Sequence, residues 1–352
     1  MNYLKDHLIS INTTIKDALK ILDNQGLIAN VLFAIDDNNN LRGSLTDGDI
    51  RRGLIKGINI SDSVEKIINK QCKYIRDSFI ENEIISTYRK SNIFFIPVVD
   101  NDMKVVSILD LRELKNIIPV DALIMAGGKG KRLLPLTLNT PKPLLKIGDK
   151  PVIEYNIDRI KSFGVKNIFI SINYLGEQLI EYFGDGASKN IAIKFIKEER
   201  PLGTIGAIKL IESALSHDTI LIMNSDLLTT IDLNGFYNEF ISADADMAVA
   251  STIYNVDIPY AVMEINNNNV VSSLKEKPKY TYYSNAGIYL IKKEVLKHIP
   301  NDFFDSTDLM ECLINEGKKI VTFPILGYWL DIGNFDDYKK AQEDIKHINI
   351  SL

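Results

Sequence analysis

Short apolar runs alternate with amphipathic stretches along the last two thirds of the chain. Residues 121–126 form an apolar run that leads into glycines, which is typical of an interior strand, and residues 151–163 carry apolar side chains at helical spacing. Further strands are expected at 167–172, 191–196 and 219–223, and further helices at 176–182 and 205–214. This alternation predicts an α/β fold built on a mostly parallel sheet.

The pattern changes beyond Asp246, where strand signals follow one another closely. Residues 266–269 are asparagines between two apolar runs, which predicts a hairpin, and 270–275 reads as its second strand. We interpret this region as an added substrate-binding sheet. Helical patterns resume at Thr307 and Phe335.

The first 118 residues contain two weakly similar halves, which indicates an internal duplication. The expected elements are a helix at 15–25, a strand at 31–35 and a turn at 36–40, then a helix at 81–90, a strand at 93–99 and a turn at 100–102. Each half ends with a hydroxyl three residues before a carboxylate, Thr46 with Asp49 and Ser107 with Asp110. One such pair is typical of a helix cap, but its recurrence suggests a further role.

This arrangement resembles a tandem CBS module of α+β type. The resemblance implies that the turns at Thr46, Asp49, Ser107 and Asp110 bind an adenine nucleotide, with the two aspartates on the ribose. Dimerisation without a ligand is the alternative that the resemblance leaves open. We expect a first domain at 1–118, with halves of about 1–60 and 61–118, and a second domain at 119–352.

The amino-acid composition excludes some classes of binding partner. It is 45% hydrophobic and 25% charged with a net charge of −5, so it lacks the basic surface that nucleic acids or anionic membranes favour. No membrane-length apolar stretch or signal-peptide core is present, and we expect a cytoplasmic protein. Cys72 and Cys312 stand far apart without metal-ligand spacing, so neither a disulfide framework nor a zinc site is expected.

A glycine-rich turn follows the strand at 121–126. Gly127, Gly128 and Gly130 would let backbone N–H groups approach phosphate oxygens, while Lys129, Lys131, Arg132 and Lys142 supply positive charge. The turn lacks the Gly-Lys-Ser/Thr of a P-loop, and the next helix begins too late for a dinucleotide fingerprint. By itself such a turn could equally be a plain strand-to-helix connection.

The longer stretch GGKGKRLLPLTLNTPKPLLKIGDKPVIEY resembles the signature of the sugar-1-phosphate nucleotidyltransferases, although Lys131 replaces a usual Thr or Ser. The resemblance implies a Rossmann-like nucleotidyltransferase domain with a mixed, mostly parallel sheet. It also implies that a triphosphate is bound at Ala126, Gly127, Gly128, Gly130 and Arg132. Arg132 would hold the leaving pyrophosphate and Lys142 would face the α-phosphate.

Two aspartates are candidates for a metal site. Asp226 follows the apolar strand at 219–224, at the sheet edge where α/β proteins bind ligands, and Asp331 stands in GYWLDIGN. Helix or turn capping is the alternative for an isolated aspartate of this kind. The resemblance implies that the two carboxylates together hold Mg²⁺.

Sugar contacts follow from the same resemblance. Glu276-Lys277-Pro278 matches an element whose glutamate binds sugar hydroxyls and whose lysine neutralises the sugar phosphate, and Asn285-Ala286-Gly287 matches one that lines the sugar pocket. A solvated charged turn is the alternative for Glu276 and Lys277.

The stretch KEERPLGTIGAI resembles the element beneath the nucleobase, with Gly203 and Thr204 offering backbone contacts. Glu198 stands where thymidylyl and uridylyl enzymes often have glutamine. A carboxylate only accepts hydrogen bonds, and guanine presents two adjacent donors, so Glu198 or Glu199 favours GTP.

These features together predict an enzyme that joins a nucleoside triphosphate, with GTP favoured, to a sugar 1-phosphate. We favour an amino sugar of glucosamine type or a heptose, because the layout resembles guanylyltransferases of bacterial glycan and legionaminic acid synthesis. The alternatives are uridylyl, thymidylyl or cytidylyl transfer and a noncatalytic nucleotide sensor. A homo-oligomer is expected.

Overall fold

The computed structural model describes residues 6–24, 31–77, 82–112, 114–348 and 350. The chain divides into two compact units, one of Met1–Ile117 with Ser162–Gly164 and Ala187–Asn190, the other of Ile118–Lys161, Val165–Gly186 and Ile191–Leu352. Each is described by itself. Among the described helices, none is long and apolar enough to cross a membrane.

The first unit holds two three-stranded sheets of the same topology. The first contains β1 (Leu8–Ser10), β2 (Val31–Ile35) and β3 (Leu41–Thr46), with α2 (Ile15–Asn24) and α3 (Asp47–Ile55), and the second contains β4 (Ile75–Arg76), β5 (Phe95–Val99) and β6 (Val105–Asp110), with α4 (Asn82–Lys90). In each sheet the first pair of strands is parallel and the second antiparallel. Gln25 and Glu81, which we expected at helix ends, lie outside the described residues.

The two halves of this unit differ at their ends. Thr46 caps α3, whereas β6 is followed by a turn, because the carboxylate of Asp110 binds the backbone N–H and the guanidinium of Arg112. Apolar side chains from both sheets, among them Phe33, Phe95 and Val99, form one shared cluster. The duplication therefore builds a pair of sheets that pack on each other.

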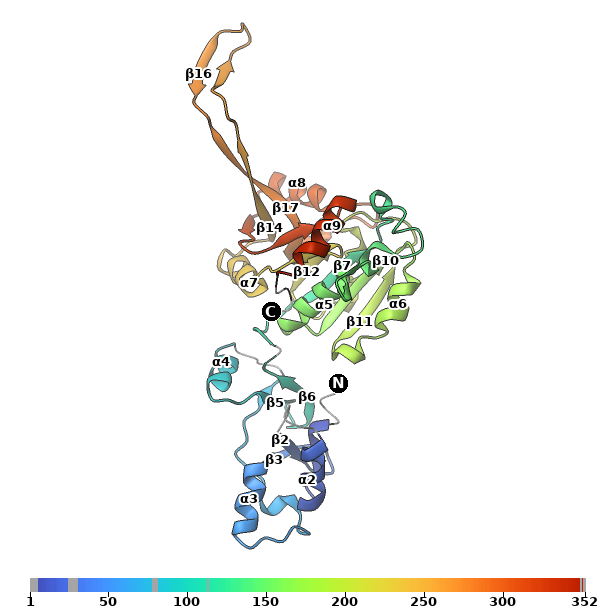
Figure 1. The fold of residues 1–352 in the computed structure, drawn as a ribbon, viewed down its shortest axis with the longest axis vertical. Helices are drawn as coiled ribbons and strands as arrows, with labels where there is room; N and C mark the ends of the chain where they lie inside the picture. Colours follow the sequence, from blue (N-terminus) through green and yellow to red (C-terminus); the bar gives the residue numbers. More distant parts are fainter. Residues whose placement is uncertain (1–5, 25–30, 78–81, 113, 349, 351–352) are drawn as a thin grey trace. The chain divides into compact units, whose positions relative to one another are not determined.

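The second unit is organised around a seven-stranded mixed sheet of order β11-β10-β7-β12-β17-β14-β18. Its strands are β7 (Asp121–Ala126), β10 (Asn167–Ile172), β11 (Ala192–Lys197), β12 (Thr219–Asn224), β14 (Met247–Asp257), β17 (Lys279–Lys292) and β18 (Ile320–Pro324). The four strands from β11 to β12 are parallel, and β17 runs antiparallel to β12 and β14. The predicted α/β fold with a mostly parallel sheet is confirmed (Figure 1).

The second unit also contains α-helices and 3₁₀ segments, some of which pack against the sheet. They are α5 (Val152–Ser162), α6 (Glu177–Phe183), α7 (Leu233–Ser242), α8 (Ser306–Asn315) and α9 (Phe335–Asp344), and the 3₁₀ segments η6 (Gly206–Ala214) and η7 (Lys293–His298). Apolar side chains of η6, η7 and α8 pack against β7, β12, β14 and β17 in one buried core. Residues 205–214, which we predicted as an ordinary helix, wind as 3₁₀ from Gly206. This tighter winding places the buried Ile205, Ile208 and Ile211, spaced by three, on one side.

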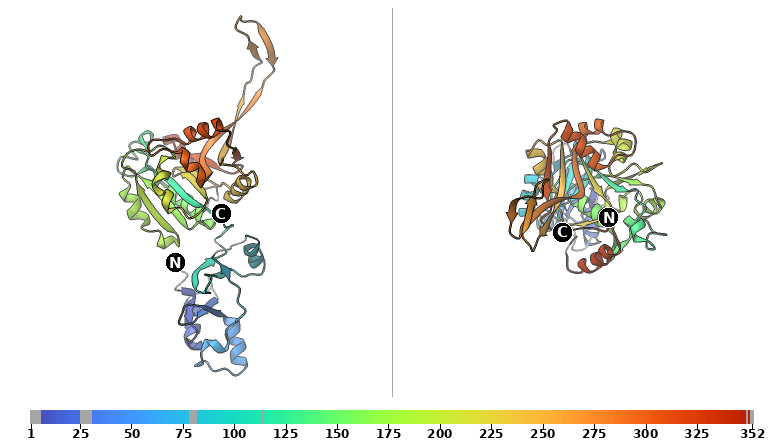
Figure 2. Two further views of the ribbon diagram at one scale, coloured as in Figure 1. Left: turned by 180° about the vertical axis from the view of Figure 1, so that it is seen from behind. Right: turned by 90° about the horizontal axis from the view of Figure 1, so that it is seen from above.

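β14 and β17 continue beyond the sheet as a two-stranded ribbon, which we call the arm (residues 252–284). Its lower part pairs Thr252 with Ser284 through to Asp257 with Lys279. Its tip is the hairpin of β15 (Val262–Ile265) and β16 (Val271–Lys275), closed by the asparagine turn at 266–269. The hairpin is confirmed, but the expected substrate-binding sheet is instead a ribbon that projects from the body (Figures 1 and 2).

Candidate active site

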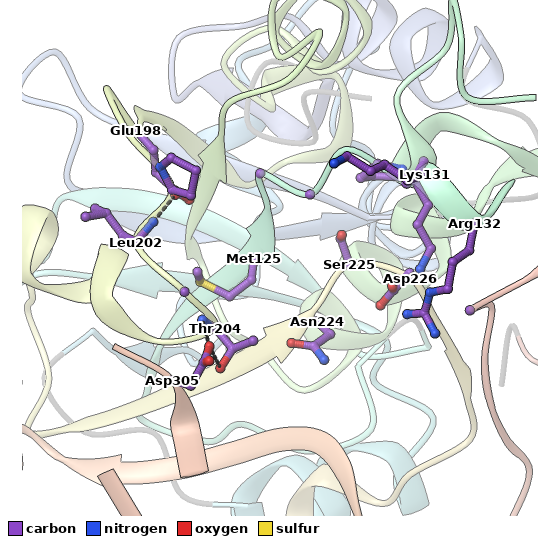
Figure 3. Close-up of a pocket in the computed structure, with 18 of the residues that line it drawn as sticks. Met125, Lys131, Arg132, Glu198, Leu202, Thr204, Asn224, Ser225, Asp226 and Asp305 are labelled. Carbon is purple, nitrogen blue, oxygen red and sulfur yellow. Dashed lines mark hydrogen bonds and ion pairs between the residues drawn. The ribbon is translucent and has the colours of Figure 1, made fainter. Parts of the chain in front are cut away.

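The parallel pairing of β7 and β12 builds the edge on which the candidate site forms. Met125 lies in register with Asn224, so the glycine-rich turn after β7 and the Asn224-Ser225-Asp226 turn after β12 meet at the carboxyl end of the sheet. A pocket of 470 Å³ opens there (Figure 3). It is lined by Met125, Gly127, Gly128, Gly130, Lys131, Arg132, Lys142, Pro143, Glu198, residues 201–204, residues 224–226, Phe303, Asp305 and Gly333.

The glycine turn is shaped for close approach. Gly130 has a φ of 60°, a left-handed value that favours glycine, and a Cβ there would lie 2.9 Å from Thr137 Cγ2. Thr137 Oγ1 donates to the Gly130 carbonyl at 2.8 Å. A Cβ on Gly128 would meet no described atom within 4 Å, so its backbone faces open space. Ala126 ends β7 and is buried, so it positions the turn rather than lining the pocket.

Strand pairing outside the main sheet brings the two predicted metal ligands together. β13 (Leu227–Thr229) pairs antiparallel with β19 (Trp329–Asp331), which places Leu227 opposite Asp331. Ile332 N–H donates to the Asp226 carbonyl at 3.1 Å. Lys142 Nζ donates to Asp226 Oδ2 and lies 4.0 Å from Asp331 Oδ1. Residues more than a hundred positions apart in sequence thus form one charged cluster.

The chemistry of this cluster fits a divalent cation. Asp331 Oδ1 is buried and has no hydrogen-bond partner among the described residues. Burial raises the pKa of Asp331, the Asp226 carboxylate raises it further, and Lys142 and Arg132 only partly oppose this shift. Two adjacent carboxylates with an unsatisfied oxygen are the ligands that Mg²⁺ prefers. A cation bound there would relieve the repulsion between them.

Glu198 is held firmly at the other end of the pocket. It is 6% exposed, and Ser171 Oγ donates to its Oε1. Leu202 N–H donates to its Oε2 at 3.0 Å (Figure 3). Glu199, the alternative that we considered, is exposed and does not line the described pocket. Glu198 is therefore a fixed acceptor rather than a solvated loop residue.

Thr204, in the loop that follows Glu198, has hydrogen bonds other than the nucleobase contact that we predicted for it. Its backbone N–H donates to Asp305 Oδ1 at 2.9 Å, and its Oγ1 donates to the same oxygen at 3.0 Å (Figure 3). The backbone contact that we predicted from Thr204 to a nucleobase is therefore already taken within the chain. Gly203 has a φ of 78° and packs against the Phe304 carbonyl, which a Cβ would approach to 2.5 Å.

Asp305 is a residue of this pocket that sequence reasoning missed. It is the N-cap of α8 and forms a capping box with Asp308. The pattern Asp-x-x-Asp ahead of an amphipathic stretch could have located the helix start. Its contact with Thr204 depends on the tertiary fold.

The predicted sugar contacts are only partly brought together. Gly287 has a φ of 72°, and a Cβ there would lie 2.5 Å from Nδ2 of the pocket residue Asn224. Asn285 is exposed, and its Oδ1 accepts from Gly287 N–H at 2.9 Å. Glu276 and Lys277 are exposed on the arm and are not among the described residues that line the pocket, because the β14–β17 ladder carries them away from the sheet edge.

A cleft of 810 Å³ lies in the first unit. Of the four predicted CBS ligands, only Thr46 lines it, together with Arg51, Phe33, Phe95 and Arg112 among others. The Asp49 carboxylate accepts from the N–H and Oγ1 of Thr46 and pairs with Arg52 at 2.7 Å. Asp110 is occupied by Arg112, and Ser107 Oγ is buried without a partner among the described residues. In this structure the two aspartates satisfy protein groups.

Comparison with known proteins places this architecture in a family. The family model described as nucleotidyl transferase matches residues 121–348, and the CBS domain model matches residues 6–56. The chain belongs to the nucleotidyl transferase family and carries a CBS domain, as the sequence resemblance indicated.

Two relatives show how far the likeness extends. The chain is similar to mannose-1-phosphate guanylyltransferase of Mycobacterium tuberculosis, with 29% identity over 64% of this chain and 64% of that protein. It is also similar to D-glycero-α-D-manno-heptose 1-phosphate guanylyltransferase of Aneurinibacillus thermoaerophilus, with 30% identity over 65% of this chain and 99% of that protein. The chain thus spans less than two thirds of the mycobacterial enzyme but nearly all of the second relative.

A solved structure supports the fold alone. It comes from Bacillus anthracis, is described as a glucose-1-phosphate thymidylyltransferase, and superposes with a TM-score of 0.54 at 24% identity. The match covers 65% of this chain and 96% of the chain in that structure.

Proposed function

We propose that this chain transfers a nucleoside monophosphate from a triphosphate to a sugar 1-phosphate and releases pyrophosphate. The observation that carries the proposal is the sheet edge at which an open glycine turn, Arg132 and Lys142 line one pocket with Asp226, while Lys142 Nζ also lies 4.0 Å from Asp331, which is not among the described residues that line that pocket. Cations and bare backbone N–H groups bind polyphosphate, and paired carboxylates bind its metal ion.

The reaction follows from the charges of its substrates. An oxygen of the sugar phosphate attacks the α-phosphorus in line, the bond from that phosphorus to the bridging oxygen breaks, and pyrophosphate leaves with the electron pair. The nucleophile is already ionised, so no side chain has to remove a proton. Arg132 would hold the leaving pyrophosphate, and Lys142, oriented by Asp226, would face the α-phosphate.

Asp226 and Asp331 would hold the metal ion. Mg²⁺ bound there supplies positive charge to the triphosphate. The unpartnered Oδ1 of Asp331 and the repulsion between the two carboxylates support this assignment.

For the nucleobase we propose guanine. The buried Glu198 carboxylate is fixed by Ser171 and Leu202 in a position that lines the pocket, and a carboxylate can accept from the two donors on one edge of guanine. Both relatives described above are named as guanylyltransferases, which supports the same choice.

For the acceptor we propose an amino-sugar 1-phosphate of glucosamine type, in bacterial glycan or legionaminic acid synthesis, on the resemblance in layout. Asn285 and Gly287, beside the pocket residue Asn224, would contact the sugar. Glu276 and Lys277 remain predicted contacts to its hydroxyls and phosphate. Mannose and heptose 1-phosphates, the acceptors in the names of the two relatives, are the matched competitors.

A substrate matrix tests the proposal. GTP, UTP, TTP and CTP are each combined with glucosamine, mannose and heptose 1-phosphates, and pyrophosphate release is measured with Mg²⁺. We expect the GTP row and the glucosamine column to give the highest kcat/KM. Turnover led by UTP, TTP or CTP would reject the guanine assignment, and GTP binding without pyrophosphate release would favour the noncatalytic sensor.

We propose separately that the cleft of the first unit takes an adenine nucleotide. Its two arginines, Arg51 and Arg112, and its aromatic lining of Phe33 and Phe95 suit a phosphate and a base. Since the cleft includes Thr46 but neither aspartate, the ribose contact would require Asp49 to exchange its present partners.

A further inference from the structure

A histidine, a cysteine and a glutamate meet at the C-terminal end of α8, and none of them is among the described residues that line the pocket. One ligand atom from each of His298, Cys312 and Glu316 lies within 4.8 Å of the other two. His298 Nδ1 is 3.0 Å from Glu316 Oε1, and Cys312 Sγ donates to the same oxygen at 3.7 Å. An imidazole, a thiol and a carboxylate gathered this closely are side chains that bind zinc in proteins.

Two packed elements hold these three side chains in place. Cys312 lies in α8 and Glu316 is its C-cap, so the two residues, four positions apart, lie on one face of the helix end. His298 is the last residue of η7. Both elements belong to the same buried core, which contains Val295 and Leu296 of η7 and Leu309 and Leu313 of α8. The three side chains therefore start from fixed positions, as a precise metal site requires.

The hydrogen bonds of the chain leave His298 only partly satisfied. Its side chain is 10% exposed, and its Nε2 is buried with no hydrogen-bond partner among the described residues. Buried polar atoms in proteins are nearly always satisfied, so this ring nitrogen indicates a partner that the described protein groups do not supply, such as an ion. Either ring nitrogen of a neutral histidine can bind zinc.

The donor atoms favour zinc over the magnesium ion that we propose for the pocket. Thiolate and imidazole ligands suit zinc, whereas Mg²⁺ takes oxygen ligands, and Asp226 and Asp331 offer oxygen only. The Glu316 side chain is 45% exposed and Cys312 is half-buried, so an ion can enter from solvent and water can complete its four ligands. The C-terminal end of a helix carries partial negative charge, which also favours a cation beside the C-cap.

We propose that His298, Cys312 and Glu316 bind a zinc ion that fastens η7 to the C-terminal end of α8. Zinc binds cysteine as the thiolate, so the thiol proton passes to solvent water when the ion binds. The sequence did not predict this site, because the two cysteines lack metal-ligand spacing and the fold alone brings His298 to Cys312. The inference does not depend on the nucleotide, the sugar or the reaction of the pocket.

The zinc ion has a structural consequence for the pocket. The segment between His298 and Cys312 contains Phe303 and Asp305, which line the pocket, and Asp305 accepts two hydrogen bonds from Thr204. A metal ion that joins the two ends of this segment restricts it as a cross-link does. We therefore expect the amides of residues 299–311 to exchange their hydrogens more slowly when zinc is bound, and unchanged exchange would contradict this role.

Cobalt binding to the full-length chain tests the proposal, because Co²⁺ takes the same ligands as zinc and absorbs strongly when one of them is a thiolate. The chain is first treated with a chelator and then titrated with Co²⁺, and the thiolate-to-cobalt charge-transfer band is recorded. Asp226 and Asp331 can bind Co²⁺ but cannot produce this band. We expect about one equivalent of thiolate-bound Co²⁺ per chain, which Zn²⁺ displaces and excess Mg²⁺ does not.

Variants identify the ligands. Cys312→Ser should abolish the band, and Cys72→Ser, which removes the other thiol of the chain, is the matched control and should keep it. His298→Gln and Glu316→Gln should each weaken Co²⁺ binding at least about tenfold, because each removes a ligand. Equal melting temperatures of the metal-free proteins check that the variants are folded. A band that survives in Cys312→Ser would overturn the proposal, and so would wild-type affinity in both glutamine variants, because a lone thiolate would then account for the binding.

Alkylation of the wild-type chain provides a test that needs no variant. Iodoacetamide is added with and without Zn²⁺, and the modification of each cysteine is followed by peptide mass. We expect Zn²⁺ to slow the alkylation of Cys312 at least about tenfold and to leave that of Cys72 unchanged, because the ion engages the sulfur that would attack the reagent. Equal alkylation of Cys312 with and without Zn²⁺, or a wild type that lacks the cobalt band, would also overturn the proposal.

Discussion

At the scale of single residues, the charged cluster of Lys142, Asp226 and Asp331 should determine whether the protein catalyses the proposed reaction. Replacing either aspartate by asparagine keeps the shape but removes a negative charge from the proposed metal site. We expect kcat to fall by about 10² to 10³ in Asp226→Asn and in Asp331→Asn, measured as pyrophosphate release at saturating substrates.

Asp336→Asn is the matched control, because Asp336 is an exposed carboxylate in the first turn of α9, close in sequence to Asp331. It should retain wild-type turnover. Full activity in Asp226→Asn would contradict the assignment.

Glu198 should decide the choice of base. In Glu198→Gln the side chain gains a donor where guanine also donates, so we expect kcat/KM for GTP to fall about tenfold or more while the values for UTP and TTP rise. Competition between the triphosphates measures the ratio directly.

Glu199→Gln makes the same change on the exposed neighbour and should leave the ratio unchanged. An unchanged ratio in Glu198→Gln would show that Glu198 only braces the 198–202 loop through Ser171 and Leu202.

Sequence patterns located most of these residues but not their partners. The strand before Asp226 and the glycine turn could be predicted from the sequence, because apolar runs and closely spaced glycines indicate the local structure of their own segment. The contact of Thr204 with Asp305 and the burial of Glu198 were not, because both depend on loops from separate parts of the chain.

At the scale of elements, Asp121 connects the start of β7 to the loop before β12. Its Oδ2 accepts from Ser216 and His217 N–H at 2.6 and 2.8 Å, and His217 Nδ1 lies 3.3 Å from its Oδ1. Burial by itself would raise the pKa of Asp121, but the bonds from His217 and Ser216 outweigh it and lower the pKa. This carboxylate therefore favours folding when it is charged.

The sign of the pH effect follows. Because the pKa of Asp121 is lower in the folded than in the unfolded state, its charged carboxylate stabilises the fold at pH values above the unfolded-state pKa of about 3.9. This stabilisation is lost as the pH falls through the folded-state pKa. We expect Asp121→Asn to lower the free energy of unfolding by about 1–3 kcal/mol at pH 7 and to weaken its dependence on pH between 5 and 3, measured by urea unfolding.

Asp218→Asn serves as the control, since Asp218 is exposed in the same loop. It should keep the wild-type slope. An Asp121→Asn variant whose stability falls with acid as steeply as the wild type would show that other groups set the pH dependence.

The elements also show where local patterns were insufficient. Residues 205–214 have a helical pattern in sequence, yet 206–214 wind as 3₁₀, and Ile205, Ile208 and Ile211, which are spaced by three, lie in the buried core. The strands at 247–257 and 279–292 were expected to form a sheet over the substrate, but their long ladder makes an arm.

At the scale of the whole molecule, the chain combines a transferase unit with a smaller unit that has its own cleft. If an adenine nucleotide binds in that cleft, Arg51 is placed to meet its phosphates. We expect Arg51→Ala to weaken AMP or ATP binding about tenfold or more in calorimetry, because a charge-assisted hydrogen bond is lost.

Lys56→Ala is the control. Lys56 is an exposed cation at the end of the same helix, and it is not among the described residues that line the cleft. Equal effects of the two substitutions would point to general charge rather than a site, and no binding of either nucleotide to the wild type would leave dimerisation as the role of this unit.

By itself the sequence determined the alternation of strands and helices, the glycine turn, the duplicated first unit and the family, because each depends on periodicity or on residues close together in the chain. Tertiary structure decided which of the named residues meet. Asp226 and Asp331 come together through β13 and β19, whereas Glu276 and Lys277 leave the pocket on the arm. Contacts between residues so far apart in sequence are set by strand pairing and core packing, which no local pattern encodes.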